Sequence, residues 1–174
     1  MKAFEYPGDA TRLVKVSAKA LDGPPPKTGD ALSADIEYQR SITTELDGQR
    51  LAPTIEAVVT IDGVVVGYVE TRAPGRTLQQ LGDAKAITEA QFETALTQWR
   101  AQLDALHRDG FVHGDPFVLD NIVVDIARDG TVRARLIDFE PPTRGFDVEK
   151  ERGEIPAGIK KLRELFGLLG KNSQ

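Results

Sequence analysis

Apolar residues recur with a helical period in the middle of this chain. From Thr88 to Asp109 they are spaced three or four positions apart, which predicts one helix with a single buried face. Thr88 and Gln91 predict a capping box at the start of this helix, and Gly110 predicts its end. The residues expected on the buried face are Phe92, Leu96, Trp99, Leu103 and Leu106.

Apolar and polar residues alternate in two other regions, and a period of two predicts β-strands. The first region, Thr54 to Glu70, is expected to form a hairpin with an Asp62-Gly63 turn. The second region joins the runs Ile122–Ile126 and Val132–Ile137 through a turn that contains Asp129-Gly130. Both regions are therefore predicted as antiparallel strand pairs.

Shorter patterns predict the remaining elements. A strand falls within Arg12 to Ala20, and a helix capped by Ser33 falls within Leu32 to Leu46. A short helix is expected to start near Thr77, and the last helix near Pro156, because proline suits a first helical turn. The apolar face of the last helix would consist of Ile159, Leu162, Leu165, Phe166 and Leu169.

Composition narrows the class of protein. A length of 174 residues suits one domain with a real core, and a net charge of −5 argues against a nucleic-acid surface. The absence of cysteine excludes disulfides and thiolate zinc sites, and two histidines exclude a His-rich metal site. Neither a signal peptide nor a membrane-spanning run is evident. We therefore expect a cytoplasmic protein, with no nucleic-acid and no membrane partner.

Oxygen-bearing side chains gather at the open end of the second predicted hairpin. Asp115 and Asn121 precede its first strand, and Asp138 follows its second strand. Because the two open ends of a strand pair lie side by side, these three side chains are expected to converge. Carboxylate and amide oxygens suit Mg²⁺, which usually shares its coordination with substrate phosphates.

The stretch Leu103 to Glu140 resembles the catalytic core of the protein-kinase-like superfamily. It contains His113-Gly114-Asp115, then Asn121, then Ile137-Asp138-Phe139-Glu140, with the predicted hairpin between the two motifs. Gly114 in the first motif and Glu140 at the end of the second make this pattern similar to that of Rio-type kinases, aminoglycoside phosphotransferases and minimal bacterial kinases.

The resemblance implies an α+β fold of one kinase-like domain that spans residues 1–174. Residues 1–69 would form a small, truncated, β-rich N-lobe with one helix. Residues 70–174 would form a mostly helical and much reduced C-lobe with the catalytic loop and the hairpin.

The resemblance also implies a role for each matching residue. Asp115 would be the catalytic residue, because it would orient the acceptor hydroxyl, and Asn121 and Asp138 would bind Mg²⁺. His113 would tie the catalytic loop to its surroundings. Glu37 would pair with Lys15 in the manner of the family's helix glutamate. The residues expected to bind ATP are Lys15, Glu37, Leu13, Val69, Val123 and Ile137, with Val69 in the strand whose backbone would contact the adenine.

Departures from the family's pattern leave alternatives open. Asn121 stands one position later than the family's asparagine, so Asp120 is the alternative metal ligand, although we prefer Asn121. Lys19 is the alternative to Lys15 as the lysine that contacts the nucleotide phosphates. Residues 21–30 form either a plain linker or a flap near the phosphates, and the few residues before the lysine strand leave no room for a full glycine-rich loop.

The activity implied by the resemblance is an ATP- and Mg²⁺-dependent phosphotransferase with an alcohol group as acceptor. A protein serine or threonine is the expected acceptor, and a small molecule such as a sugar or amino alcohol is the alternative. Whether a partner completes the truncated lobes is left open by the sequence. A pseudokinase that binds nucleotide or a partner without catalysis is the competing interpretation. A host cytoplasm is the expected location if the protein is a delivered effector.

Overall fold

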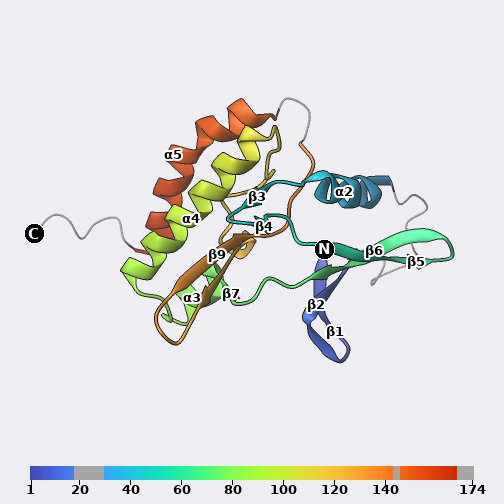
Figure 1. Cartoon of the computed structure of the whole chain (residues 1–174), viewed down its shortest axis with the longest axis horizontal. Helices are drawn as coiled ribbons and strands as arrows, with labels where there is room; N and C mark the ends of the chain where they lie inside the picture. The colour runs from blue at the N-terminus through green and yellow to red at the C-terminus, as the bar shows by residue number, and fades with distance from the viewer. Residues whose placement is uncertain (18–29, 143–145, 168–174) are drawn as a thin grey trace, which may run out of the picture. The chain divides into compact units, whose positions relative to one another are not determined.

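The computed structural model describes residues 1–17, 30–142 and 146–167, and Figure 1 shows how its elements follow one another. The chain forms two compact units. The first unit consists of Met1–Thr43 and Ala52–Ala73, and the second of Thr44–Leu51 and Pro74–Gln174. Each unit combines helices with strands, which confirms the predicted α+β class.

The first unit contains a four-stranded antiparallel sheet in the order β1-β2-β6-β5. The predicted hairpin is confirmed as β5 and β6, and Asp62 and Gly63 between them have φ values of +51° and +78°. These values are typical of a type I′ turn, which Asp-Gly favours. The edge strand β1 was not predicted, because its residues are all exposed and show no alternation of burial. The strands are β1 Lys2–Tyr6, β2 Asp9–Val16, β5 Ile55–Ile61 and β6 Val64–Thr71.

Helix α2, Asp30–Ser41, packs on one face of this sheet, where Ile36 is buried with Ile55 and Tyr68. The predicted helix from Leu32 to Leu46 was wrong at both ends. The helix begins before Ser33, which therefore is not its cap, and it ends before Leu46.

The segment after α2 folds into a two-stranded hairpin and belongs to the second unit. Its strands are β3, Glu45–Leu46, and β4, Gln49–Arg50. Asp47 and Gly48 turn the chain with φ values of +54° and +71°, the same turn chemistry as in the β5–β6 hairpin. Glu45 and Leu46 therefore belong to a strand that leads into this turn, and not to the helix.

The long helix of the second unit is α4, Glu89–Arg108, as predicted. Thr88 and Gln91 form the expected capping box, and the whole apolar stripe is buried. A shorter helix, α3, Leu78–Asp83, begins after its cap Thr77, which also confirms the prediction.

A three-stranded sheet in the order β7-β8-β9 lies beside α4 (Figure 1). The predicted second hairpin is confirmed as β8 and β9, which pair from Ile122 with Leu136 to Ile126 with Val132. The outer edge of β9 is covered by side chains of α4. The strands are β7 Arg76–Thr77, β8 Ile122–Ile126 and β9 Val132–Leu136.

Two glutamines make this contact between α4 and β9. Gln98 donates to the Val132 oxygen at 2.9 Å and accepts from the Ala134 nitrogen at 2.7 Å. Gln102 donates to the Ala134 oxygen at 2.8 Å and accepts from the Leu136 nitrogen at 3.0 Å. The glutamines therefore take the place of a fourth strand and satisfy backbone groups that would otherwise be left unpaired.

Helix α5, Val148–Leu165, begins after the cap Asp147, so the predicted start near Pro156 was wrong. A proline inside a helix costs about 3 kcal/mol, because it removes a hydrogen bond and clashes with the preceding turn. The helix nevertheless continues through Pro156, since the fully buried Ile155 and Leu162 lie on either side of it. Residue Leu165, expected on the buried face, is 58% exposed, and Leu169 lies outside the described residues.

The loop after His113 packs closely against α5. Phe117 lies over Gly158, where an added Cβ would come within 2.1 Å of the Phe117 ring. Trp99 of α4 donates from Nε1 to the Pro116 oxygen at 3.0 Å, on the residue next to this contact. Gly158 is therefore required by the close approach of an aromatic ring, whereas Gly153 on the same helix has open space around it.

We expect Gly158→Ala and Gly153→Ala to change stability in opposite directions. Gly158→Ala forces Phe117 to move and should lower the free energy of unfolding by about 1–3 kcal/mol. Gly153→Ala should raise it by about 0.5–1 kcal/mol, because alanine is the better helix former and nothing obstructs its methyl group. Urea denaturation followed by circular dichroism measures both, and two stabilising substitutions would contradict the packing of Phe117.

Candidate functional site

Hydrogen bonds of Asn121 connect the predicted metal ligands of the second unit. Asn121 ends the short 3₁₀ helix η1, Leu119–Asn121, which leads into β8. Its side-chain amide donates to the backbone oxygen of Asp115 at 2.9 Å. Its own backbone oxygen accepts from the backbone nitrogen of Ile137 at 3.0 Å. Since Asp138 follows Ile137, the backbones of Asp115, Asn121 and Asp138 adjoin at the open end of the β8–β9 hairpin.

The two candidate metal ligands at positions 120 and 121 differ in what their side chains contact. The Asp120 carboxylate accepts from the hydroxyl of Thr77, the cap of α3, at 2.9 Å. Asn121 uses its amide nitrogen for the Asp115 oxygen, and an amide oxygen is an acceptor that a hard cation can use. The two side chains thus have different contacts, and the preference for Asn121 over Asp120 stays a prediction.

Asp138 has a left-handed backbone, with φ of +62°. Such a conformation costs on the order of 1–3 kcal/mol for a residue other than glycine and persists only where neighbouring contacts hold it. Here the contacts lie on both sides of Asp138: the Ile137 nitrogen donates to the Asn121 oxygen, and the Glu140 nitrogen donates to the His113 oxygen at 2.9 Å. Held conformations of this kind gather at functional sites.

His113 is fully buried beneath this loop and uses both ring nitrogens. Nε2 donates to the Ile137 oxygen at 2.9 Å, and Nδ1 accepts from the Asp115 nitrogen at 3.4 Å. Burial lowers the pKa of His113 to about 4, against the attraction of Glu151, Asp138 and Asp115 for its charged form. A neutral ring with one donor and one acceptor therefore ties the residues before and after the hairpin together.

Glu151 of α5 holds the loop of the candidate site, and sequence reasoning missed it. Its buried carboxylate accepts from the nitrogens of His113 at 3.0 Å and Gly114 at 2.9 Å, and from Nε2 of His107 at 2.7 Å. Burial would raise the pKa of Glu151, but the hydrogen bonds from His107, His113 and Gly114 hold it below its usual range. Its spacing with Ile155, Gly158 and Leu162 is a helical stripe, which the proline between them concealed.

The lysine predicted to contact phosphate lies in the first unit. Lys15 is 3% exposed, and its Nζ is 2.9 Å from Oε1 of Glu70, which is 2% exposed. Gln39 of α2 donates to the other Glu70 oxygen at 2.9 Å. The predicted pairing of Lys15 with Glu37 is therefore corrected: α2 turns Gln39 toward the sheet and leaves Glu37 exposed.

The strand register explains the choice of Glu70. Leu13 of β2 pairs with Glu70 of β6, and Lys15 pairs with Tyr68, so all four side chains share one face of the sheet. Leu13 and Lys15 thus face the same side, as predicted. Val69 lies in β6, which has β2 on one side and β5 on the other. The hydrogen bonds to these two strands use the backbone groups that were predicted to contact the adenine. That predicted backbone contact is corrected.

The two remaining predicted ATP contacts lie in the second unit. Val123 is buried in β8 and pairs with Thr77 on one side and Arg135 on the other. Ile137 is half-buried just after β9, between His113 and Asn121, to which it is hydrogen-bonded. Both are thus apolar side chains next to the loop that carries Asp138. The alternative lysine, Lys19, and the possible flap at 21–30 fall within or beside residues 18–29, which lie outside the described part.

A metal site made only of protein side chains is not found within residues 1–17, 30–142 and 146–167: no three His, Cys, Asp or Glu residues group to hold a metal ion. Mg²⁺ commonly takes one or two carboxylates and completes its shell with phosphate and water. Asn121 and Asp138 fit that donor set. In the same described ranges, no helix has the length and apolar character needed to cross a membrane.

Comparison with known proteins shows a partial likeness to a solved structure. No family model and no curated protein matches the chain. Among solved structures, the chain is similar to the medium-resolution structure of the bifunctional kinase-methyltransferase WbdD, with 26% sequence identity and a TM-score of 0.45. The alignment covers 74% of this chain and 27% of that one, so this chain spans well under two thirds of that protein.

We expect Glu151→Gln to lower the free energy of unfolding by about 3 kcal/mol or more. The amide would bring its own donor toward N–H groups that need an acceptor, and it would leave buried groups unpaired. Urea denaturation at pH 7 provides the measurement. Glu149→Gln is the matched control on the same helix, because the Glu149 side chain is 80% exposed. Equal, small losses in both variants would refute the structural role of Glu151.

Stability should fall as the pH drops from 6.5 to about 4. The folded protein holds His113 neutral down to a pKa of about 4, whereas the unfolded chain protonates it near its ordinary value of 6.5. Between these two pH values the unfolded state therefore binds one more proton at this residue than the folded state does. This lowers the free energy of unfolding by about 1.4 kcal/mol per pH unit and by about 3 kcal/mol in total. Below pH 4 both states are protonated at this residue, and its contribution levels off.

Urea unfolding from pH 7 to pH 4 measures this dependence. His113→Gln cannot protonate, so its free energy of unfolding should decline less steeply than that of the wild type. The carboxylates, Glu151 included, titrate in both proteins, so the difference between the two slopes isolates His113. Identical slopes would contradict the neutral buried ring.

Proposed function

We propose that this protein is an ATP- and Mg²⁺-dependent phosphotransferase with an alcohol group as acceptor. The observation that carries the proposal is the connection of Asp115, Asn121 and Asp138 at the end of one rigid hairpin, with Asp138 held in a left-handed conformation. Phosphoryl transfer depends mostly on positioning and on neutralising phosphate charge. Oxygen ligands on a hairpin whose edge is bonded to α4 meet that requirement.

Each residue has a distinct task in this proposal. The exposed carboxylate of Asp115 orients the acceptor hydroxyl and accepts its proton. Asn121 and Asp138 provide an amide and a carboxylate oxygen for Mg²⁺, which neutralises phosphate charge when it is bound. His113 and Glu151 do not touch substrate; they keep the loop before Asp115 in place.

In the first unit, Lys15 provides the cation for the nucleotide phosphates. Glu70 takes over the task predicted for Glu37, since its carboxylate orients the Lys15 ammonium group at 2.9 Å. Leu13 lies on the same face as Lys15 and offers an apolar contact to the nucleotide base. In the second unit, Val123 and Ile137 offer the corresponding apolar contacts beside Asp138.

A protein serine or threonine is our proposed acceptor. Asp115 is exposed, and Val118 three residues later is 37% exposed, although it is apolar. An exposed carboxylate with an exposed apolar residue three positions later suits an extended protein segment better than an enclosed small molecule. A sugar or amino alcohol is the alternative acceptor within the same reaction class.

One observation favours a second candidate function, a pseudokinase. The Lys15 side chain is 3% exposed and already paired with a buried carboxylate, so little of its ammonium group is open to a nucleotide phosphate. A protein that binds a partner without catalysis does not need that access. Nucleotide binding and phosphate transfer, measured separately, distinguish the two functions.

The test begins with thermal unfolding of the wild type, Asp138→Asn and Asp120→Asn in ATP, with and without Mg²⁺. A ligand at 100 times its Kd adds about 2.7 kcal/mol of stability, so a nucleotide site should appear as a rise in Tm. We expect a Mg²⁺-dependent rise in the wild type and in Asp120→Asn, and none in Asp138→Asn. An equal rise in all three proteins would place the metal elsewhere.

The second part measures transfer from labelled ATP to a panel of serine and threonine peptides and to sugars and amino alcohols. Asp115→Ala should retain the Mg²⁺-dependent rise in Tm but transfer phosphate at least about 100-fold more slowly than the wild type. Nucleotide binding without transfer to any acceptor would support the pseudokinase. No nucleotide binding by any of the proteins would sink the phosphotransferase proposal.

A further inference from the structure

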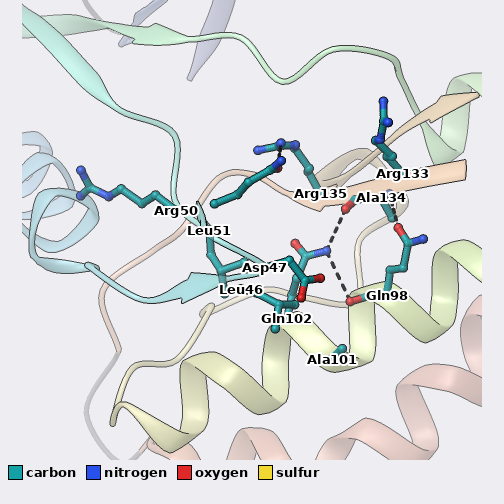
Figure 2. A pocket seen from close by; sticks show the side chains of 11 residues that line it. Leu46, Asp47, Arg50, Leu51, Gln98, Ala101, Gln102, Arg133, Ala134 and Arg135 are labelled. Carbon is teal, nitrogen blue, oxygen red and sulfur yellow. Dashed lines mark hydrogen bonds between the residues drawn. The ribbon is translucent and has the colours of Figure 1, made fainter. Parts of the chain in front are cut away.

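A pocket of about 350 Å³ lies wholly within the second unit, and none of its lining residues has a role in the proposed phosphotransferase, although Arg135 is the cross-strand neighbour of Val123. It is bounded by the β3–β4 hairpin, α4 and the edge strand β9, and Figure 2 shows its side chains. Its volume is that of a small-molecule site. None of its lining residues takes part in the hydrogen bonds of Asp115, Asn121 or His113.

Positive charge distinguishes this pocket from the rest of the chain. Its lining contains three arginines, Arg50, Arg133 and Arg135, and one acidic residue, Asp47, and Figure 2 shows the Arg50 side chain directed away from the other two arginines. The whole chain carries a net charge of −5. A concentration of arginines on an acidic protein needs an explanation, because like charges in one hollow repel one another unless an anion separates them.

Arg133 and Arg135 lack a carboxylate within ion-pair distance in the part of the chain that the structure describes, although Asp125 is the cross-strand neighbour of Arg133 and the charge of Arg133 also acts on Asp129. Arg135 donates to the side-chain oxygen of Gln49, a neutral partner on the β3–β4 hairpin. The planar fork of donors in a guanidinium group matches the spacing of carboxylate and phosphate oxygens. Both guanidinium groups are therefore suited to an external anion.

The geometry places these two arginines side by side. They lie two residues apart on β9, so they project from the same face of the strand, with Cα atoms about 6.6 Å apart. Figure 2 shows both on one side of the pocket, with Gln98, Gln102 and Ala101 of α4 on the other side. The two glutamines are committed to the β9 edge, which keeps the strand and its arginines fixed to the helix.

Apolar surface completes the pocket opposite the arginines. Ala101 of α4 is exposed into this region, and Leu46 and Leu51 of the hairpin segment also line it. A ligand that fits must therefore carry an anionic group for the guanidinium forks and a compact apolar body for the alanine and leucines. The Asp47 carboxylate lies near the centre in Figure 2 and disfavours ligands with a second anionic group there.

We propose that this pocket binds a small phosphate monoester with a compact apolar body. A phosphate monoester carries about −1.5 to −2 charges near pH 7 and three acceptor oxygens, which match the two guanidinium forks of Arg133 and Arg135. A carboxylate brings one charge and two oxygens, which one arginine can already satisfy. The bound phosphate would lie against β9, which carries Arg133 and Arg135.

Phenyl phosphate is the probe, titrated into the full chain at low ionic strength by isothermal calorimetry. We expect saturable binding by the wild type and at least tenfold weaker binding by Arg133→Gln and by Arg135→Gln. Arg108→Gln is the matched control, because Arg108 is an exposed arginine of α4 outside the pocket, and its affinity should stay within twofold of the wild type. Absence of saturable binding, or equal loss in all three variants, would overturn the proposal.

Further variants and ligands test whether the guanidinium groups and the phosphate make the binding contact. Gln49→Ala removes the neutral partner of Arg135 from the pocket lining but keeps the positive charge, so it should weaken binding of the probe less than Arg135→Gln does; an equal or larger loss would mean that the hairpin, not the guanidinium group, matters. Benzyl alcohol should not bind, and benzoate should bind at least tenfold more weakly than phenyl phosphate; equal affinity for benzoate would overturn the choice of phosphate. Asp138→Asn should bind phenyl phosphate normally, and a loss there would place the probe at the proposed nucleotide site.

Discussion

The loop that carries the candidate catalytic residue depends on one buried carboxylate. An isolated carboxylate in a protein interior would lose its charge, so Glu151 stays ionised only because it accepts from His107, His113 and Gly114. Through these bonds, a side chain of α5 connects the end of α4 with the two residues before Asp115. Three segments that are far apart in sequence thus meet at a single charged group, and the loop has little freedom to move without breaking it.

Side-chain amides position the other half of the site. β9 is an edge strand, and Gln98 and Gln102 of α4 bond to its outer backbone groups in a fixed register. A slip of one residue along the strand would exchange donors for acceptors, so the hairpin has one favourable position on the helix. Asn121 and Asp138 lie at the open end of that hairpin, and they are therefore placed by the same helix that His107 anchors to Glu151.

Lys15 illustrates how packing selects among residues of the same chemistry. A carboxylate partner for this lysine could be predicted from the sequence, but Glu37 and Glu70 are chemically alike. Helix α2 buries Ile36 and Gln39 against the sheet, which turns Glu37 to solvent, while the pairing of β2 with β6 brings Glu70 to the face of Lys15. The structure thus contains the predicted ion pair between Lys15 and a glutamate, but the glutamate comes from strand β6 and not from helix α2.

Local patterns in the sequence determined α4, the β5–β6 hairpin and the β8–β9 hairpin. Each depends on contacts between residues a few positions apart: a capping box, an Asp-Gly turn, or a period of 3.6 or 2. The order of Asp115, Asn121 and Asp138 around a hairpin likewise sufficed to place their backbones together. Only the tertiary structure decided the early start of α5 and the role of Glu151, because these depend on burial against residues distant in sequence, which outweighs the local preference of a proline to begin a helix.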